Sequence, residues 1–286
     1  MATARDLQRQ INTVKNQARV FSALQTVSSV KFRKAEARVK KARPYADNVE
    51  EMMRDVADSA SGDLPLLVGR EVNRVAICTL TADRGLAGGF NAQVLRRTVS
   101  LRNEKDTDAL QVASGRKAVA FFRFRRVELA EVFTGFTDNP TYEKAREIGS
   151  TLTNLFEDEE ADEVYLVFNR FESVMNQTPV VKRLLPVAEE GDEDEDEGAS
   201  YMEYVPDAET VLKRIVPRYV ETMVWQALLE GAAGEHGARM TAMKNATDNA
   251  NDLVRDLTLQ MNKARQAQIT QEILEIVGGA EALSAG

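Results

Sequence analysis

Two long segments with helical spacing of apolar residues open and close the chain. The first ends near Ala57, and its apolar residues recur by threes and fours in one heptad register. These residues are Leu7, Ile11, Val14, Ala18, Phe21, Phe32, Ala35, Val39, Ala42, Ala46, Val49, Met53 and Val56. A strict seven-residue repeat predicts a helix that supercoils in a left-handed sense around a partner. Gln25 and Ser28 are the polar members of this seam, and Pro44 predicts a kink or a weakened turn.

The closing segment, residues 238–283, repeats the same spacing. Its stripe consists of Met243, Ala246, Ala250, Leu253, Leu257, Gln260, Ala264, Ala267, Ile269, Ile273, Ile276, Ala280 and Leu283. Each stripe needs a partner, so we expect the two terminal helices to pair as an antiparallel coiled coil. Beyond about Thr258 the first helix is too short to cover the second. The stripe from Ile269 to Leu283 must therefore face something else.

Three interruptions are predicted in the second long helix. Asp207 is a good N-cap residue for its start. Pro217 is expected to stop the first piece and to begin the next. Gly231, Gly234 and Gly237 each cost about 1 kcal/mol relative to alanine inside a helix. Three glycines in seven residues therefore predict a bend, a frayed turn or a hinge.

Between these segments the periodicity alternates between strand and helix. Strands are predicted at 71–83, 110–113, 127–136, 164–171 and 180–187. Helices are predicted at 91–102, from Gly115 onward, and from Pro140 onward with Asp138 or Asn139 as its cap. This alternation is typical of an α/β domain with a partly parallel sheet. The predicted fold class is α/β, a Rossmann-like domain inserted between long helices that form an antiparallel left-handed coiled coil. The predicted boundaries are 1–57, 58–206 and 207–286.

Charge is unevenly distributed along the chain. The net charge is −8, and eight carboxylates between Glu189 and Glu197 account for all of it. Residues 1–43 instead contain 11 Lys and Arg against Asp6 and Glu36, a local charge of +9. The acidic stretch, residues 188–200, is predicted to be a solvated loop. The basic first helix suits either nucleic acid or an acidic protein partner.

Residues for catalysis or metal binding are scarce. His236 is the only histidine, and Cys78 is the only cysteine and lies within a predicted strand. These two residues cannot supply a zinc set, a disulfide or a Ser/His triad with a good base. GLAGG at 85–89 and SGRK at 114–117 follow strands as phosphate loops do, but neither has the Walker or dinucleotide-binding spacing. No metal and no cofactor is predicted, and tight turns are favoured over nucleotide binding. No apolar run reaches the ~20 residues of a membrane span.

Several longer motifs identify a family. DRGLAGGFN at 83–91 resembles the D-R-G-L-C-G-G-x-N motif of the gamma subunit of F-type ATP synthase. ARMTAMKNATDNA at 238–250 and NKARQAQITQEILEIVGGAEAL at 262–283 are similar to its C-terminal signatures. RPYA at 43–46, PTYEKAREI at 140–148 and DEVYLVFNRF at 162–171 match as well. Together these motifs extend over essentially the whole chain.

The resemblance implies a central rotor shaft that performs no catalysis itself. In this family the shaft couples rotation of the membrane c-ring to conformational changes of the catalytic subunits, for ATP synthesis or hydrolysis. The implied partners are the alpha and beta subunits of the hexamer, the epsilon subunit and the c-ring. Contact with the membrane would come only through the c-ring. An N-terminus without a transit-type segment favours a bacterial subunit, peripheral on the cytoplasmic face of the plasma membrane.

The resemblance also assigns contact residues. Family contacts between shaft and hexamer fall on Leu24, Arg239, Arg265, Gln266, Thr270 and Glu272. Family contacts between foot and c-ring fall near Tyr201, Glu203 and Tyr204. The alternative function is a basic coiled-coil architectural protein that binds nucleic acid through Lys31, Arg33, Lys34 and Arg38. A nucleotide-using enzyme is the third hypothesis.

Overall fold

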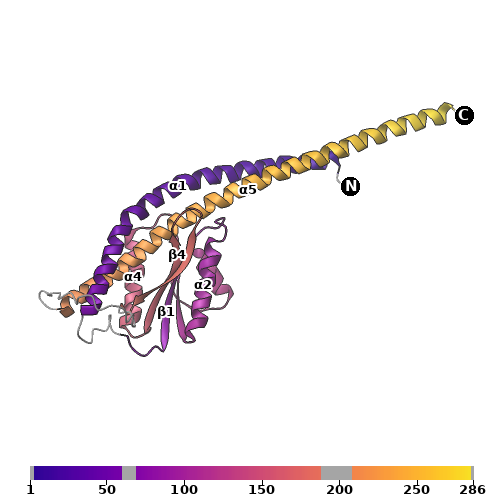
Figure 1. The fold of residues 1–286 in the computed structure, drawn as a ribbon. Coiled ribbons are helices and arrows are strands. Elements are labelled where there is room, and N and C mark those ends of the chain that lie inside the picture. The colour runs from indigo at the N-terminus through magenta and orange to yellow at the C-terminus, as the bar shows by residue number, and fades with distance from the viewer. Residues whose placement is uncertain (1–2, 60–68, 188–207, 285–286) are drawn as a thin grey trace. The chain divides into compact units, whose positions relative to one another are not determined.

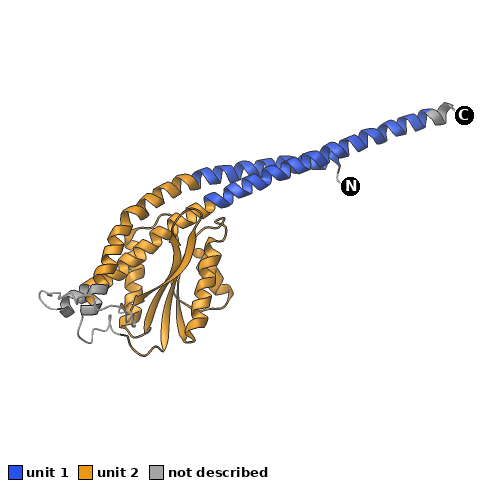
Figure 2. Cartoon of the chain, viewed as in Figure 1, with its two compact units in different colours: residues 1–27, 240–286 blue, residues 28–239 orange. Residues whose placement is uncertain are grey.

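The computed structural model describes residues 3–59, 69–187 and 208–284, and it confirms the predicted succession of helices and strands (Figure 1). In chain order the elements are α1 (Ala4–Ser59), β1 (Arg74–Leu80), α2 (Phe90–Lys105), β2 (Asp108–Ser114), α3 (Arg116–Phe124), β3 (Leu129–Phe133), α4 (Tyr142–Glu157), β4 (Glu163–Phe171), β5 (Gln177–Leu185) and α5 (Ala208–Ser284). The chain divides into two compact units, residues 28–239 and residues 1–27 with 240–286 (Figure 2). We describe each unit by itself.

The larger unit is built around a mixed five-stranded sheet of order β3-β2-β1-β4-β5. Strand β1 is parallel to β2 and β4, and β2 is parallel to β3. Only β5, at one edge, runs antiparallel to its neighbour β4. The four parallel strands follow the order of a Rossmann half, and this order places the carboxyl ends of β1, β2 and β3 at one end of the sheet.

Helices cover both faces of this sheet. On one face, α2 packs on β1 and β4 through Val94 and Leu101, and α3 packs on β2 through Ala118 and Phe122. On the other face lie α4 and the parts of α1 and α5 that belong to this unit. Their buried side chains form one continuous core with β1, β2 and β4. Strands with helices on both faces need apolar residues on both sides, which explains the continuous apolar run of β1.

The predicted seam of α1 is confirmed. Leu7, Ile11, Ala18, Ser28, Phe32, Ala35, Val39, Ala46, Val49, Met53 and Val56 are all buried. In the larger unit Phe32 packs in one cluster with Ala233 of α5, whereas Val56 shares a cluster with Val216. Later residues of α1 therefore pack against earlier residues of α5, so the two helices are antiparallel, as Figure 1 also shows.

In the smaller unit the C-terminal part of α5 keeps its apolar side chains exposed. Met243 and Ala250 are buried. Ile269, Ile273 and Ile276 are 47%, 54% and 71% exposed, and Leu274 and Val277 are also at least half exposed. Within this unit the stripe from Ile269 to Ala280 is therefore not covered, as its length relative to the N-terminal helix predicted.

One predicted helix break is wrong, because Pro217 does not stop a first piece but lies inside α5. Helix α1 continues through Pro44, and the kink or weakened turn expected there stays a prediction. The glycine triplet does not fray α5, because the helix is continuous across it, and the alternative bend or hinge stays a prediction. A β-carbon at Gly234 would lie 2.9 Å from the Phe90 ring, so this glycine permits close packing. The predicted cap Asp207 and the acidic loop 188–200 lie outside the described residues.

The start of α4 also differs from the prediction. The helix begins at Tyr142, with Thr141 at the N-cap position, not at Pro140 with Asp138 or Asn139 as the cap. The side chains of Asp138 and Asn139 instead bond to other elements. Capping propensity describes local competition only, and here partners distant in sequence have taken these side chains.

Candidate functional site

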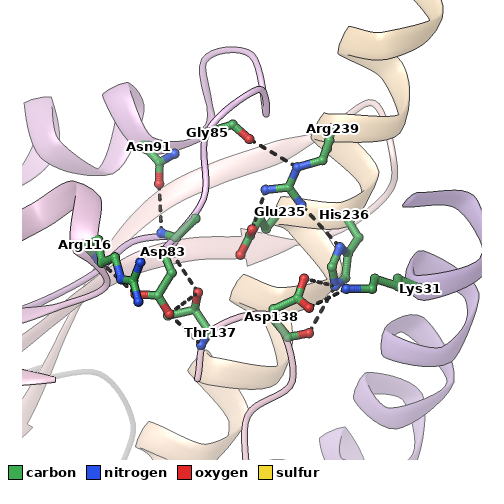
Figure 3. Close-up of polar contacts among 11 residues, drawn as sticks. Lys31, Asp83, Gly85, Asn91, Arg116, Thr137, Asp138, Glu235, His236 and Arg239 are labelled. Atoms are coloured by element: carbon green, nitrogen blue, oxygen red, sulfur yellow. Dashed lines mark hydrogen bonds and ion pairs between the residues drawn. The ribbon is translucent and has the colours of Figure 1, made fainter. Parts of the chain in front are cut away.

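The loops at the carboxyl ends of β1, β2 and β3 converge on the carboxylate of Asp83 (Figure 3). The backbone N–H groups of Gly135 and Thr137 donate to its Oδ2 at 2.8 and 3.1 Å, and the Thr137 hydroxyl donates to the same oxygen at 3.1 Å. The backbone N–H of Arg116, the first residue of α3, donates to Oδ1 at 3.1 Å. In return the Asp83 N–H donates to Thr137 Oγ1 at 2.8 Å. One carboxylate thus joins three loops.

This carboxylate lies where related folds place an anion. A helix N-terminus following a parallel strand, with converging backbone N–H groups, is a common phosphate site. Burial disfavours the charged form of Asp83, but the hydrogen bonds from Gly135, Thr137 and Arg116 outweigh it and hold the pKa below its usual value. At neutral pH the chain's own anion therefore binds these donors. Because Arg116 belongs to SGRK, that arrangement agrees with the interpretation of SGRK as a turn.

Behind this loop cluster, α5 carries three buried ionisable side chains in one turn: Glu235, His236 and Arg239. Arg239 donates through NH2 to Glu235 Oε1 at 2.5 Å and through Nε to the Gly85 carbonyl at 3.2 Å. Burial raises the pKa of Glu235, and Arg239 opposes that rise. The arginine thus ties α5 to the β1–α2 loop.

His236 links this arginine to the β3–α4 loop, residues 134–141. Its Nδ1 lies 3.4 Å from Arg239 NH1, and its Nε2 lies 3.2 Å from the Asp138 carbonyl. Because a guanidinium can only donate, Nδ1 must accept, and the proton on Nε2 then donates to Asp138. Burial lowers the pKa of His236 against the raising influence of Asp138. The ring is therefore a neutral hydrogen-bonding bridge.

Helix α1 reaches the same loop from a second direction. Lys31 forms an ion pair with Asp138 Oδ2. Arg38 donates to Asn139 Oδ1 and to the Pro140 carbonyl, both at 2.7 Å. The β3–α4 loop is therefore bonded to Asp83 on the sheet side and to α1 and α5 on the helix side (Figure 3).

The predicted contact residues fall into two groups. Leu24 is half-buried, and Arg265, Gln266, Thr270 and Glu272 are exposed on α5 in the smaller unit. Helical spacing arranges these four with the apolar residues in two adjacent ladders, 265-269-272-276 and 266-270-273-277. They therefore share one broad face of the helix with Ile269, Ile273, Ile276 and Val277.

Arg239 differs, because it is 8% exposed and its guanidinium bonds to groups of its own chain. Its contact with a partner stays a prediction. Tyr201, Glu203 and Tyr204 lie outside the described residues.

Sequence reasoning did not find the cluster formed by Lys31, Asp83, Asp138 and His236. The sequence predicts Lys31 on a nucleic-acid face and Asp138 as a helix cap, and it offers no role for the single histidine, His236. Asp83 was visible only inside the DRGLAGGFN motif. The four residues come from separate elements, so no local spacing connects them.

Neither a metal-binding cluster nor a membrane-spanning helix is found among the described residues. Within 3–59, 69–187 and 208–284, no three His, Cys, Asp or Glu side chains gather as a metal site would require. Across the same ranges, none of the helices has both the length and the apolar character of a membrane span. Cys78 is fully buried, and burial raises the pKa of its thiol to about 12.

Comparison with known proteins gives consistent matches over the whole chain. The family model described as ATP synthase matches residues 3–283. The chain is 67% identical over 290 residues to the ATP synthase gamma chain of Rubrobacter xylanophilus, and the match covers all of both chains. It is 45% identical to the ATP synthase gamma chain of Desulfitobacterium hafniense over 99% of this chain and all of that one.

Solved structures share the fold at low identity. A chain of the Euglena gracilis mitochondrial ATP synthase (OSCP/F1/c-ring) matches with a TM-score of 0.73 at 18% identity, over 99% of this chain and 95% of that one. A chain of the Tetrahymena thermophila mitochondrial ATP synthase (central stalk/c-ring) matches with a TM-score of 0.62 at 20% identity, over 79% and 99%.

Proposed function

This chain belongs to the ATP synthase gamma chain family, and we propose that it is the central rotor shaft of a proton-transporting F-type ATP synthase. In this role the paired helices turn inside a hexamer of alpha and beta subunits. Their rotation couples movement of the c-ring to conformational changes at the catalytic subunits. Nothing in the comparisons supports the nucleic-acid alternative. Two of its four basic residues, Lys31 and Arg38, are already bonded to the β3–α4 loop.

The exposed apolar face of α5 is the observation that carries this proposal. Five large apolar side chains between Ile269 and Val277 are roughly half exposed or more. A continuous exposed apolar surface on a long helix marks a binding surface. A protein collar that surrounds the helix without fixing one orientation would cover such a face and still let the helix turn.

The polar residues of the same face are proposed as contacts with this collar. Arg265, Gln266, Thr270 and Glu272 share the two ladders with the apolar side chains and are exposed. Leu24 on α1 is proposed as a further contact with a catalytic subunit. For Arg239 the bonds within the chain support a role in fixing α5, and a direct partner contact would require its guanidinium to leave them.

The remaining assignments rest on the family alone. We propose that Tyr201, Glu203 and Tyr204 contact the c-ring, and that the epsilon subunit binds the α/β domain. The subunit would then be peripheral on the cytoplasmic face of a bacterial plasma membrane, in contact with the membrane only through the c-ring.

We further propose that the chain catalyses nothing itself and that the nucleotide sites belong to its partners. The Asp83 carboxylate supports this, because it bonds to donors that would otherwise be available to a phosphate.

Native mass spectrometry of the complex purified through this chain tests the proposal. The expected particle contains three copies each of two large subunits with one copy of this chain. Reconstitution in vesicles supplies the functional test, because proton-driven ATP synthesis should require this chain. Isolation of the chain alone, together with undiminished synthesis in its absence, would overturn the proposal.

A further inference from the structure

The geometry points to the β3–α4 loop, residues 134–141, as a joint that transmits torque between the α/β domain and the two long helices. This inference rests on the proposed function, since torque matters only in a rotating shaft. All residues of this joint belong to the larger unit.

The sheet side of the joint is rigid. Gly135 and Thr137 are held by Asp83 through three hydrogen bonds to one carboxylate oxygen, and the Asp83 N–H returns a fourth bond to Thr137. Asp83 also accepts from the first N–H of α3. The loop therefore cannot move without moving β1 and α3.

The helix side of the joint engages both long helices at three consecutive residues. Asp138 receives Lys31 from α1 and His236 from α5, while Asn139 and Pro140 receive Arg38 from α1. His236 in turn bonds to Arg239, which holds the β1–α2 loop at Gly85. Asp138 therefore bonds to both helices at once, and Phe171 of β4 does the same through Arg43 of α1 and Glu230 of α5.

Directional bonds at this position provide what the apolar core does not. Apart from the polar contacts at Phe171 and the Lys182–Glu50 ion pair, the contact between α1, α5 and the sheet is largely apolar burial, which is strong but non-directional. Such a surface resists separation more than it resists rotation or sliding of a helix about its own axis. Hydrogen bonds weaken steeply when their angles change, so bonds from two helices to one anchored loop resist that rotation.

Charge substitutions in the reconstituted complex test the joint. Lys31→Asp would place a carboxylate against Asp138 and loosen α1 from the loop. The two measurements, taken on the same vesicles, are the ATP hydrolysis rate and ATP-driven proton uptake. A loosened joint holds the α/β domain less firmly when the c-ring resists rotation, so the domain slips against the c-ring in some turnovers and that hydrolysis moves no protons. Proton uptake per ATP should therefore fall by about threefold.

Two further variants separate a joint from a general loss of structure. Lys144→Asp makes the same charge change in the exposed Lys144–Glu147 pair on α4 and should leave the ratio at the wild-type value. The exchange Lys31→Asp with Asp138→Lys restores an opposite pair and should recover much of the lost ratio. A structural defect alone would lower complex yield and hydrolysis together, and the exchange would not restore the ratio.

The outcomes are distinguishable from those that test the proposed function. If the wild-type chain neither assembles nor supports proton uptake, the shaft itself is refuted. If the wild type couples and Lys31→Asp couples equally well, only the joint is refuted. Should Lys31→Asp fail to assemble, Arg38→Ala decides in the same assay, because its loss removes both bonds to Asn139 and Pro140. An unchanged ratio in that variant would overturn the joint.

Discussion

Two glycines three residues apart on α5 should respond differently to the same substitution. At Gly231 a new β-carbon would meet no neighbouring atom within 4 Å. At Gly234 it would lie 2.9 Å from Phe90 Cε2 and 3.5 Å from Gln177 Oε1. Both positions are helical, so Gly231→Ala and Gly234→Ala gain the same helix propensity and differ only in what the methyl group meets.

The magnitudes follow from these contacts. Replacing glycine by alanine in a helix interior stabilises it by about 1 kcal/mol. Forcing an extra methyl into a packed core costs about 1–3 kcal/mol. Phe90 is 4% exposed and its carbonyl is held by Asn169 at 2.9 Å, so its ring has little room to withdraw. Gly231→Ala should therefore stabilise the larger unit by about 1 kcal/mol, whereas Gly234→Ala should be neutral or destabilise it by up to about 2 kcal/mol.

Trp225 reports this directly, because it is the only tryptophan, belongs to α5 itself and packs, partly buried, against a core cluster. Denaturant unfolding followed by its fluorescence gives the free energy of unfolding for each variant. In a Phe90→Ala background the clash is absent, so Gly234→Ala should become stabilising, a non-additivity that a double-mutant cycle measures. Equal stabilisation by both alanines in the wild-type background would refute the close contact with Phe90.

Three further predictions concern the shaft and the cluster. Ala264→Pro should cost about 3 kcal/mol or more locally and abolish coupled synthesis, while the Trp225 unfolding transition stays at its wild-type midpoint. Ile273→Asp should leave the melting of the isolated chain unchanged, since the side chain is 54% exposed, but should weaken assembly with the hexamer in a native gel titration. Burial lowers the pKa of His236. As the pH falls, His236 is therefore protonated in the unfolded chain before it is protonated in the folded chain. The stability that the buried neutral ring contributes is lost as the pH falls below about 6.5. His236→Gln should remove that part of the pH dependence of the unfolding midpoint between pH 7 and 5.

The spacing of apolar residues predicted the long helices well, because a helix with one buried face needs apolar residues at helical spacing. Every seam position from Leu7 to Val56 that the heptad register selected is buried or half-buried. The exposure of Ile269 to Val277 was also predictable, because it follows from comparing the lengths of two stripes. The strands were found for the same reason, since helices on both faces require continuous apolar runs.

Local breaking signals failed where tertiary packing overrides them. Pro217 lies inside a long helix where a break was predicted, and Gly234 serves the approach of Phe90 without fraying the helix. A proline lacks one N–H and disturbs one turn, which a helix held by partners on either side of that turn can tolerate. Helix propensity describes the free-energy cost of proline and glycine inside a helix, but it carries no information about the packing that outweighs this cost here.

The polar cluster was not predictable from spacing. Asp138 is 107 residues from Lys31 and 98 residues from His236 in the chain. Their juxtaposition depends on the crossover from β3 to α4 and on the antiparallel path of α5. The motif around Asp83 identified a family, but only the structure gives the motif a physical role, as the anion that fastens three loops.

Rotation of the α/β domain against a fixed hexamer tests the central claim most directly. Phe124 is 89% exposed, so Phe124→Cys gives an attachment point for a bead, and the buried Cys78, with its pKa raised to about 12, should not compete for the label. With the hexamer fixed to a surface and ATP added, the bead should turn continuously in one direction. A bead that stays still while the same complexes hydrolyse ATP would contradict the shaft mechanism.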